Sequence, residues 1–136
     1  DSHLGSIWEG TSNIVSLDAI RALKKEDNIF VLKNYLIKII SNTEDNDDLI
    51  FFKKIVEEVF HFISIEITNN ENFNSRQVAS ALYYLCASIF LSEESRFCTS
   101  LNYRNKISKL LIQHKLMKRN PIKPDDLDKS IIFSFI

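Results

Sequence analysis

Glycine and proline are scarce in this sequence, with only two residues of each among 136. Hairpins and tight turns depend on these residues for their backbone dihedral angles, so a protein built from short strands would contain more of them. The deficit therefore favours long helices.

Cysteine is equally scarce. Cys86 and Cys98 are the only two thiols. They lack the two-residue spacing of zinc and redox pairs, and two thiols do not make a disulfide framework. We therefore expect a reducing intracellular compartment, either the cytoplasm or, in a eukaryote, the mitochondrial matrix.

Long hydrophobic runs are absent as well. The longest apolar stretch, residues 82–91, contains Tyr, Cys and Ser and reaches half the length of a membrane span. No charged and then apolar leader opens the chain, which starts with Asp1, and we expect the sequence to begin within a longer protein. These features predict that no membrane span is present.

Charge of one sign is also lacking. The net charge is −1 with 26% charged residues, so nothing global directs the protein toward nucleic acid or an anionic membrane. Any basic surface must be local.

Apolar material with helical spacing is what the sequence does contain. Apolar residues make up 45% of it, including ten Phe, which is enough for the core of one domain of this length. Their spacing predicts helices that start near residues 12, 28, 48, 75 and 101 and end near 25, 41, 68, 94 and 119. The third helix carries the longest apolar stripe and is predicted to be central, and the fourth is predicted to pack among the others. The fold class is therefore an all-α bundle of about five helices.

Polar residues mark the predicted helix boundaries. Asp27, Asp47 and Asn74 are placed to cap the second, third and fourth helices, and Pro121 stops the fifth. The chain ends in an apolar tail that would promote aggregation if it were free, so we expect it to dock on the bundle or on a partner. Its apolar residues are Ile131, Ile132, Phe133, Phe135 and Ile136.

One segment resembles a known family. Residues 6–14 read SIWEGTSNI, and a helical pattern with Leu17, Ile20, Arg21, Ala22 and Leu23 follows. This order is similar to the C-terminal signature of acyl-CoA dehydrogenases, in which an aromatic residue precedes Glu-Gly-Thr or Glu-Gly-Ser and a helix ending in an Ala-Arg-Ala-Leu-like stretch comes next. Trp8 in place of the commoner Tyr, and the roughly 110 residues that follow, resemble the long-tailed, AidB-like branch of adaptive-response proteins.

The resemblance implies a role for Glu9 as the base that removes the alpha proton of an acyl-CoA thioester, while the beta hydrogen leaves as hydride to FAD. Burial beside substrate would raise the basicity of such a carboxylate. Its backbone amide would support the thioester carbonyl as a donor of the oxyanion-hole kind. Gly10 would let backbone and substrate approach closely.

The resemblance places the FAD contact at Thr11, Ser12 and Asn13. We expect a helix to start there, with free backbone amides suited to an anionic group. Asn13 departs from the Gln or Glu common at its position in the family.

The resemblance also divides the chain into three parts. Residues 1–25 form the signature segment and first helix, 26–120 a helical extension, and 121–136 the apolar tail. The family's upstream domains supply most of the flavin and acyl-CoA pocket, so the intact parent is expected to be the enzyme. This piece is expected to be inactive alone, without FAD of its own, and to form homo-oligomers as the family does. A second hypothesis makes the extension an interaction module, for oligomerisation or for DNA, of an AidB-like protein.

A basic stretch keeps the DNA hypothesis open. No acidic residue lies between residues 101 and 123, and a helical projection puts four cations on an arc of about 100°: Arg104, Lys115, Lys118 and Arg119. Such an arc either contacts phosphates or forms an ordinary solvated helix face.

Metal binding is not expected. Glu58 and His61 have the Glu-x-x-His spacing of di-iron bundles, but no second copy of that spacing occurs. We interpret the pair as surface or interhelix hydrogen bonding, and His114 as a core or interface histidine.

Overall fold

The computed structural model describes residues 2–42, 45–69, 74–97 and 103–118, with side chains from residue 12 onward. These residues form five α-helices and no strand: α1 (Ser2–Leu23), α2 (Asn28–Ile40), α3 (Asn46–Thr68), α4 (Ser75–Phe97) and α5 (Tyr103–Lys115). The all-α prediction is confirmed. Residues 119–136, and with them the predicted docking of the tail, lie outside the described part of the chain.

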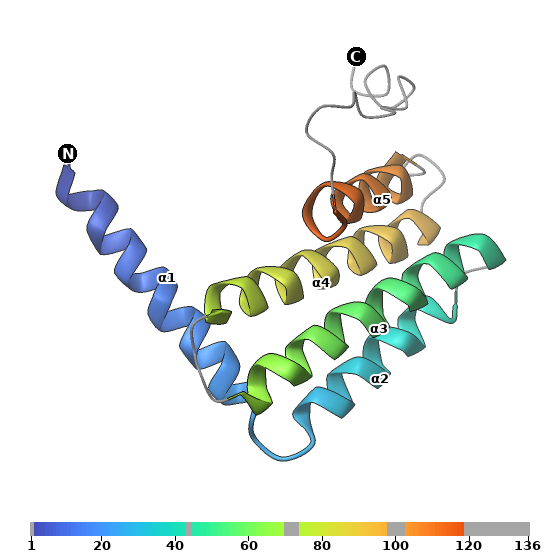
Figure 1. Cartoon of the computed structure of the whole chain (residues 1–136). Coiled ribbons are helices and arrows are strands. Elements are labelled where there is room, and N and C mark those ends of the chain that lie inside the picture. The colour runs from blue at the N-terminus through green and yellow to red at the C-terminus, as the bar shows by residue number, and fades with distance from the viewer. Residues whose placement is uncertain (1, 43–44, 70–73, 98–102, 119–136) are drawn as a thin grey trace.

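The helices α2, α3 and α4 lie side by side, and α5 packs on α4 (Figure 1). Only α4 contacts all four other helices in substantial numbers, so the fourth predicted helix does pack among the others. Helix α1 crosses the end of the bundle, and its N-terminal half projects away from the other helices (Figure 1).

The core is built mainly on one face of α3. Its apolar stripe recurs at helical spacing and is almost fully buried: Phe52, Ile55, Val56, Val59, Phe60 and Ile63. Leu36 of α2, Leu85 of α4 and Ile112 of α5 have no exposed surface and belong to the same cluster. The long stripe predicted for the third helix therefore supplies much of the core, while α4 is the helix that packs against all the others.

Two helix boundaries differ from the sequence-based prediction. Helix α1 begins at Ser2, ten residues earlier than expected. The segment 2–11 contains both glycines of the chain, which disfavour a helix, but it contains no proline, so the helix can continue through it. Helix α5 ends at Lys115, because the backbone amides of Leu116 and Met117 both donate to Ile112 O, at 2.9 and 3.1 Å, and close the last turn.

The caps also differ in detail. Asp45, not Asp47, caps α3: its carboxylate accepts from the amides of Asp47 at 2.9 Å and Asp48 at 3.4 Å. Asp27 occupies the N-cap position of α2 but makes no side-chain cap hydrogen bond. The side chain of Asn74 donates to Glu66 Oε2 at 2.9 Å.

None of the helices within the described residues is long and apolar enough to cross a membrane.

Candidate functional site

The signature segment lies in the projecting half of α1. Glu9 precedes Ser16, the first buried side chain described on this helix, by seven residues, or about 10 Å along the helix axis. The bundle described here therefore packs against the second half of α1, well away from the predicted base.

The predicted anion-binding helix start is wrong. Helix α1 is continuous from Ser2, so the backbone amides of residues 11–13 lie inside it rather than at its beginning. Interior helix amides are used by the carbonyls four residues earlier and have no free N–H for a phosphate. The FAD contact at Thr11 and Ser12 stays a prediction that rests on the resemblance alone.

Asn13 has a structural partner in this chain. Its Oδ1 accepts a hydrogen bond from Arg76 Nε at 2.6 Å, which ties α1 to the first turn of α4. The side chain at this predicted FAD-contact position therefore contributes to the packing of two helices.

The second half of α1 packs on the bundle along one edge only. Ser16, Ile20 and Leu23 are buried, and Ser16 Oγ donates to Ser12 O at 2.8 Å. Ile14, the last residue of the signature, and Val15, which follows it, are 61% and 60% exposed. An uncovered apolar surface therefore begins where the signature ends.

An apolar groove, which we call the α1–α2 groove, has its first lining residue at Ala19, four positions after Val15 on α1. It has a volume of about 490 Å³ and is lined by α1, α2 and one residue of α4: Ala19, Ala22, Leu23, Asn28, Val31, Leu32, Tyr35 and Leu82. The one amide among them is satisfied, because Asn28 Nδ2 donates to Ala22 O at 2.7 Å. The groove therefore offers an almost purely hydrophobic surface.

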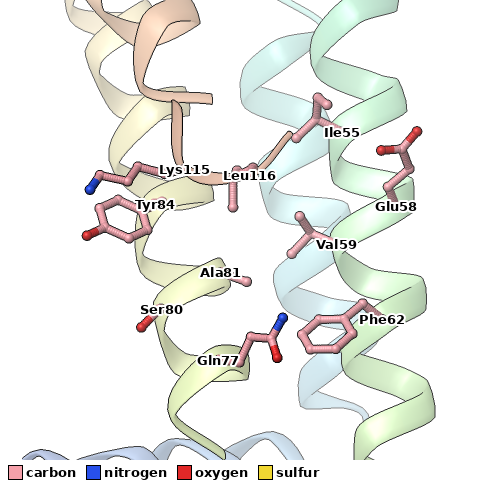
Figure 2. Close-up of a pocket in the computed structure, with 10 residues that line it drawn as sticks. All are labelled: Ile55, Glu58, Val59, Phe62, Gln77, Ser80, Ala81, Tyr84, Lys115 and Leu116. Carbon is pink, nitrogen blue, oxygen red and sulfur yellow. The ribbon is translucent and has the colours of Figure 1, made fainter. Parts of the chain in front are cut away.

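A second cavity, the α3–α4 pocket, lies where α5 ends (Figure 2). It has a volume of about 250 Å³. Leu116 points into it from the end of α5, and Ala81 lines it from α4 with a small side chain (Figure 2). The Phe62 ring and the Gln77 amide face each other across it (Figure 2). Glu58 and Lys115 line its rim with their charged ends directed outward (Figure 2).

The predicted basic arc is partly neutralised by other helices. Arg104 forms an ion pair with Glu94 of α4, and Lys115 lies 5.4 Å above the ring of Tyr84. Lys118 is exposed, and Arg119 lies outside the described residues. Glu94, the acid that meets Arg104, lies ten positions earlier on α4 and therefore outside the stretch from 101 to 123 in which the basic pattern occurs.

A buried polar network joins α3, α4 and α5 and was not predicted. Asp48 is 5% exposed, and its carboxylate accepts from Asn105 Nδ2 at 2.7 Å and from Lys109 Nζ. Asn105 Oδ1 accepts in turn from Ser92 Oγ at 3.0 Å. In the sequence, the sign of this network is Asp48 in the first turn of α3. An acidic residue at such a position is normally interpreted as solvent-exposed.

The Glu-x-x-His pair, Glu58 and His61, lies on α3. Within the described residues no three His, Cys, Asp or Glu side chains are close enough to hold an ion. Glu58 pairs with Lys54 at 3.9 Å, in line with the expectation of surface interactions. His114 is half-buried in the last turn of α5.

Cys86 is a half-buried thiol on α4, and burial raises its pKa above the usual 9.0. Because the folded state holds this proton more tightly than the unfolded state, ionisation destabilises the fold as the pH rises above 9. In a Cys98→Ser chain we expect Cys86 to react with a disulfide reagent more slowly than in the urea-unfolded chain, with its rate still rising above pH 9. A folded thiol that reacts at the unfolded rate would contradict this burial.

The fold and the candidate site together define an all-α bundle with a projecting helix that carries the Trp-Glu-Gly-Thr segment. Comparison with protein-family models, curated proteins and solved structures finds no match for this chain.

Proposed function

We propose that this chain is the C-terminal part of an FAD-dependent acyl-CoA dehydrogenase-like oxidoreductase, which as an intact protein converts an acyl-CoA to its enoyl form. The observation that carries the proposal is the ordered run SIWEGTSNI at residues 6–14 with its expected apolar helix behind it. A lone Glu-Gly-Thr would carry little weight. The aromatic residue before it and the helical context after it make the pattern specific.

Glu9 is the residue with the chemical role in this proposal. Its carboxylate takes the alpha proton of the thioester, and its backbone amide helps to hold the carbonyl oxygen, on which charge develops. FAD, when bound by the intact protein, accepts the beta hydrogen as hydride. The FAD contact at Thr11 and Ser12 stays part of this proposal, and the upstream domains are expected to supply most of the flavin pocket.

The arrangement of α1 supports the proposal. The signature lies on a helix half that projects from the bundle, and the apolar side chains where it ends, Ile14 and Val15, are exposed. A general base for a carbon acid works in a dry site, because desolvation raises its basicity. A helix that extends beyond its own bundle is suited to completing such a site with upstream domains.

The test uses the polypeptide encoded when the reading frame is extended upstream of Asp1. We expect this protein to purify with visible flavin absorbance that bleaches when one member of a panel of acyl-CoA thioesters is added without oxygen. The 136-residue chain should show no flavin absorbance. A longer protein without flavin, or with a flavin that no thioester reduces, would overturn the proposal.

The second candidate is an interaction module that mediates oligomerisation. The observation that favours it is the α1–α2 groove, which is larger and more apolar than the α3–α4 pocket. Its DNA-binding version has less support, because Arg104 is paired with Glu94 and Lys109 with Asp48. Phosphate contacts would have to compete with these acids for the same cations.

A further inference from the structure

The α1–α2 groove is an unusual surface for a folded chain to leave in water. Val31 and Tyr35, one turn apart on α2, are 62% and 54% exposed, and the small side chains of Ala19 and Ala22 form the opposite wall. Contiguous exposed apolar patches on soluble domains usually mark a binding surface. The geometry therefore calls for an apolar occupant.

We propose that the occupant is the apolar end of the same chain, residues 131–136. Five of these six side chains are Ile or Phe, and the sixth is Ser134. The groove matches this chemistry, since its only amide is already bonded to Ala22 O. The α3–α4 pocket matches it less well, because it is smaller and is rimmed by Glu58, Gln77 and Ser80.

The length of the remaining chain allows this docking. Leu116, just after α5, lines the α3–α4 pocket together with Ala81, and the next residue of α4, Leu82, lines the α1–α2 groove. The end of α5 and the groove therefore lie at the same level of α4, on different sides of it. A helix with its side chains is about 10–12 Å across, whereas residues 119–130 span up to about 40 Å when extended.

Charge complementarity favours the same placement. Asp125, Asp126 and Asp128 lie shortly before the apolar end, with Lys129 and Ser130 between Asp128 and Ile131. Two exposed lysines lie near groove-lining residues in the sequence: Lys25, two positions after Leu23 and followed by Glu26 and Asp27, and Lys38, three positions after Tyr35 on α2. An apolar segment seated in the groove would bring its acidic neighbours close to these cations.

The experiment places a nitroxide next to the apolar end of the full 136-residue chain, through Ser130→Cys in a Cys86→Ala, Cys98→Ser background. Methyl NMR signals of Ala19, Ala22 and Val31 are then observed with the label oxidised and reduced. We expect the oxidised label to broaden these groove signals strongly and to leave that of Val56, in the core face of α3, much less affected. Val31→Asp should abolish the broadening, and Ile50→Asp, at a 66% exposed site on α3, should not.

A mixed sample separates this proposal from its alternatives. Isotope-labelled chains without nitroxide are combined with unlabelled chains that carry it. Broadening in the single-chain sample and none in the mixture supports docking of the chain's own end. Broadening of the groove signals in the mixture would mean that the apolar end of a second copy occupies the groove. If the groove signals broadened in neither sample, the apolar end would not bind in the groove. Either result would overturn the proposal.

Discussion

Glu9→Gln is expected to stop thioester-driven reduction of the flavin in the upstream-extended protein. Glutamine keeps the size of the side chain and can still hydrogen-bond, but it cannot accept the alpha proton. General bases typically contribute about 10²–10⁴-fold, and we expect a loss of at least this size in the anaerobic rate of flavin bleaching. Flavin content and acyl-CoA binding should be retained, because the change removes the acceptor of the proton and little else.

Asp18→Asn is the matched control. Asp18 lies on the same helix, is exposed, and pairs with Arg21 at 2.6 Å, so its loss should leave the bleaching rate within a factor of about two. If Glu9→Gln bleached at the parental rate, Glu9 would not be the base. If the variant lost its flavin, Glu9 would have a structural role, and the assignment of proton abstraction to it would fail.

The helical fold could be predicted because apolar spacing and polar breaks agree along most of the chain. The stripe of α3 fixes both the helix and its buried face, and the polar run around residues 42–48 separates α2 from α3. The signal fails where a helix does not pack. The first half of α1 leaves the bundle and carries only a short apolar group, Leu4, Ile7 and Trp8, together with both glycines of the chain, so the sequence-based start lies ten residues too late.

From the sequence, the candidate site can be located only as a segment, residues 6–14, without its three-dimensional surroundings. The order of residues 6–14 identifies Glu9, but whether the amides at 11–13 are free depends on where α1 begins, which the local pattern did not reveal. The contact of Asn13 with Arg76 spans 63 positions in the sequence, and that of Asn105 with Asp48 spans 57. Such contacts depend on how helices pack, and no local pattern encodes them.

Polar contacts contribute to the attachment of α5 beside its apolar burial. Ser108 and Ile112 are its two buried residues among those described, and Ser108 Oγ donates to Ser88 O at 2.6 Å. Next to them, Asn105 and Lys109 both donate to the buried carboxylate of Asp48. A helix held in this way should be sensitive to the loss of a single charge.

Lys109→Met is therefore expected to lower the free energy of unfolding by about 2–3 kcal/mol. Removing one partner of a fully buried ion pair typically costs about 3–5 kcal/mol, because the other charge remains buried without compensation. The cost expected for Lys109→Met is lower than for a fully buried pair because the Lys109 side chain is 38% exposed and Asn105 still donates to Asp48. Urea unfolding measures the change, and hydrogen exchange should show the amides of α5 losing protection first.

Two further variants isolate the cause. Lys54→Met removes an exposed pair with Glu58, in which the atoms are 3.9 Å apart, and should cost no more than about 0.5 kcal/mol. Adding Asp48→Asn to Lys109→Met should recover much of the loss, because the asparagine oxygen can still accept from Asn105 and no buried charge remains. If Lys109→Met cost no more than Lys54→Met, or if the double variant were less stable than the single one, the uncompensated carboxylate would not be the cause.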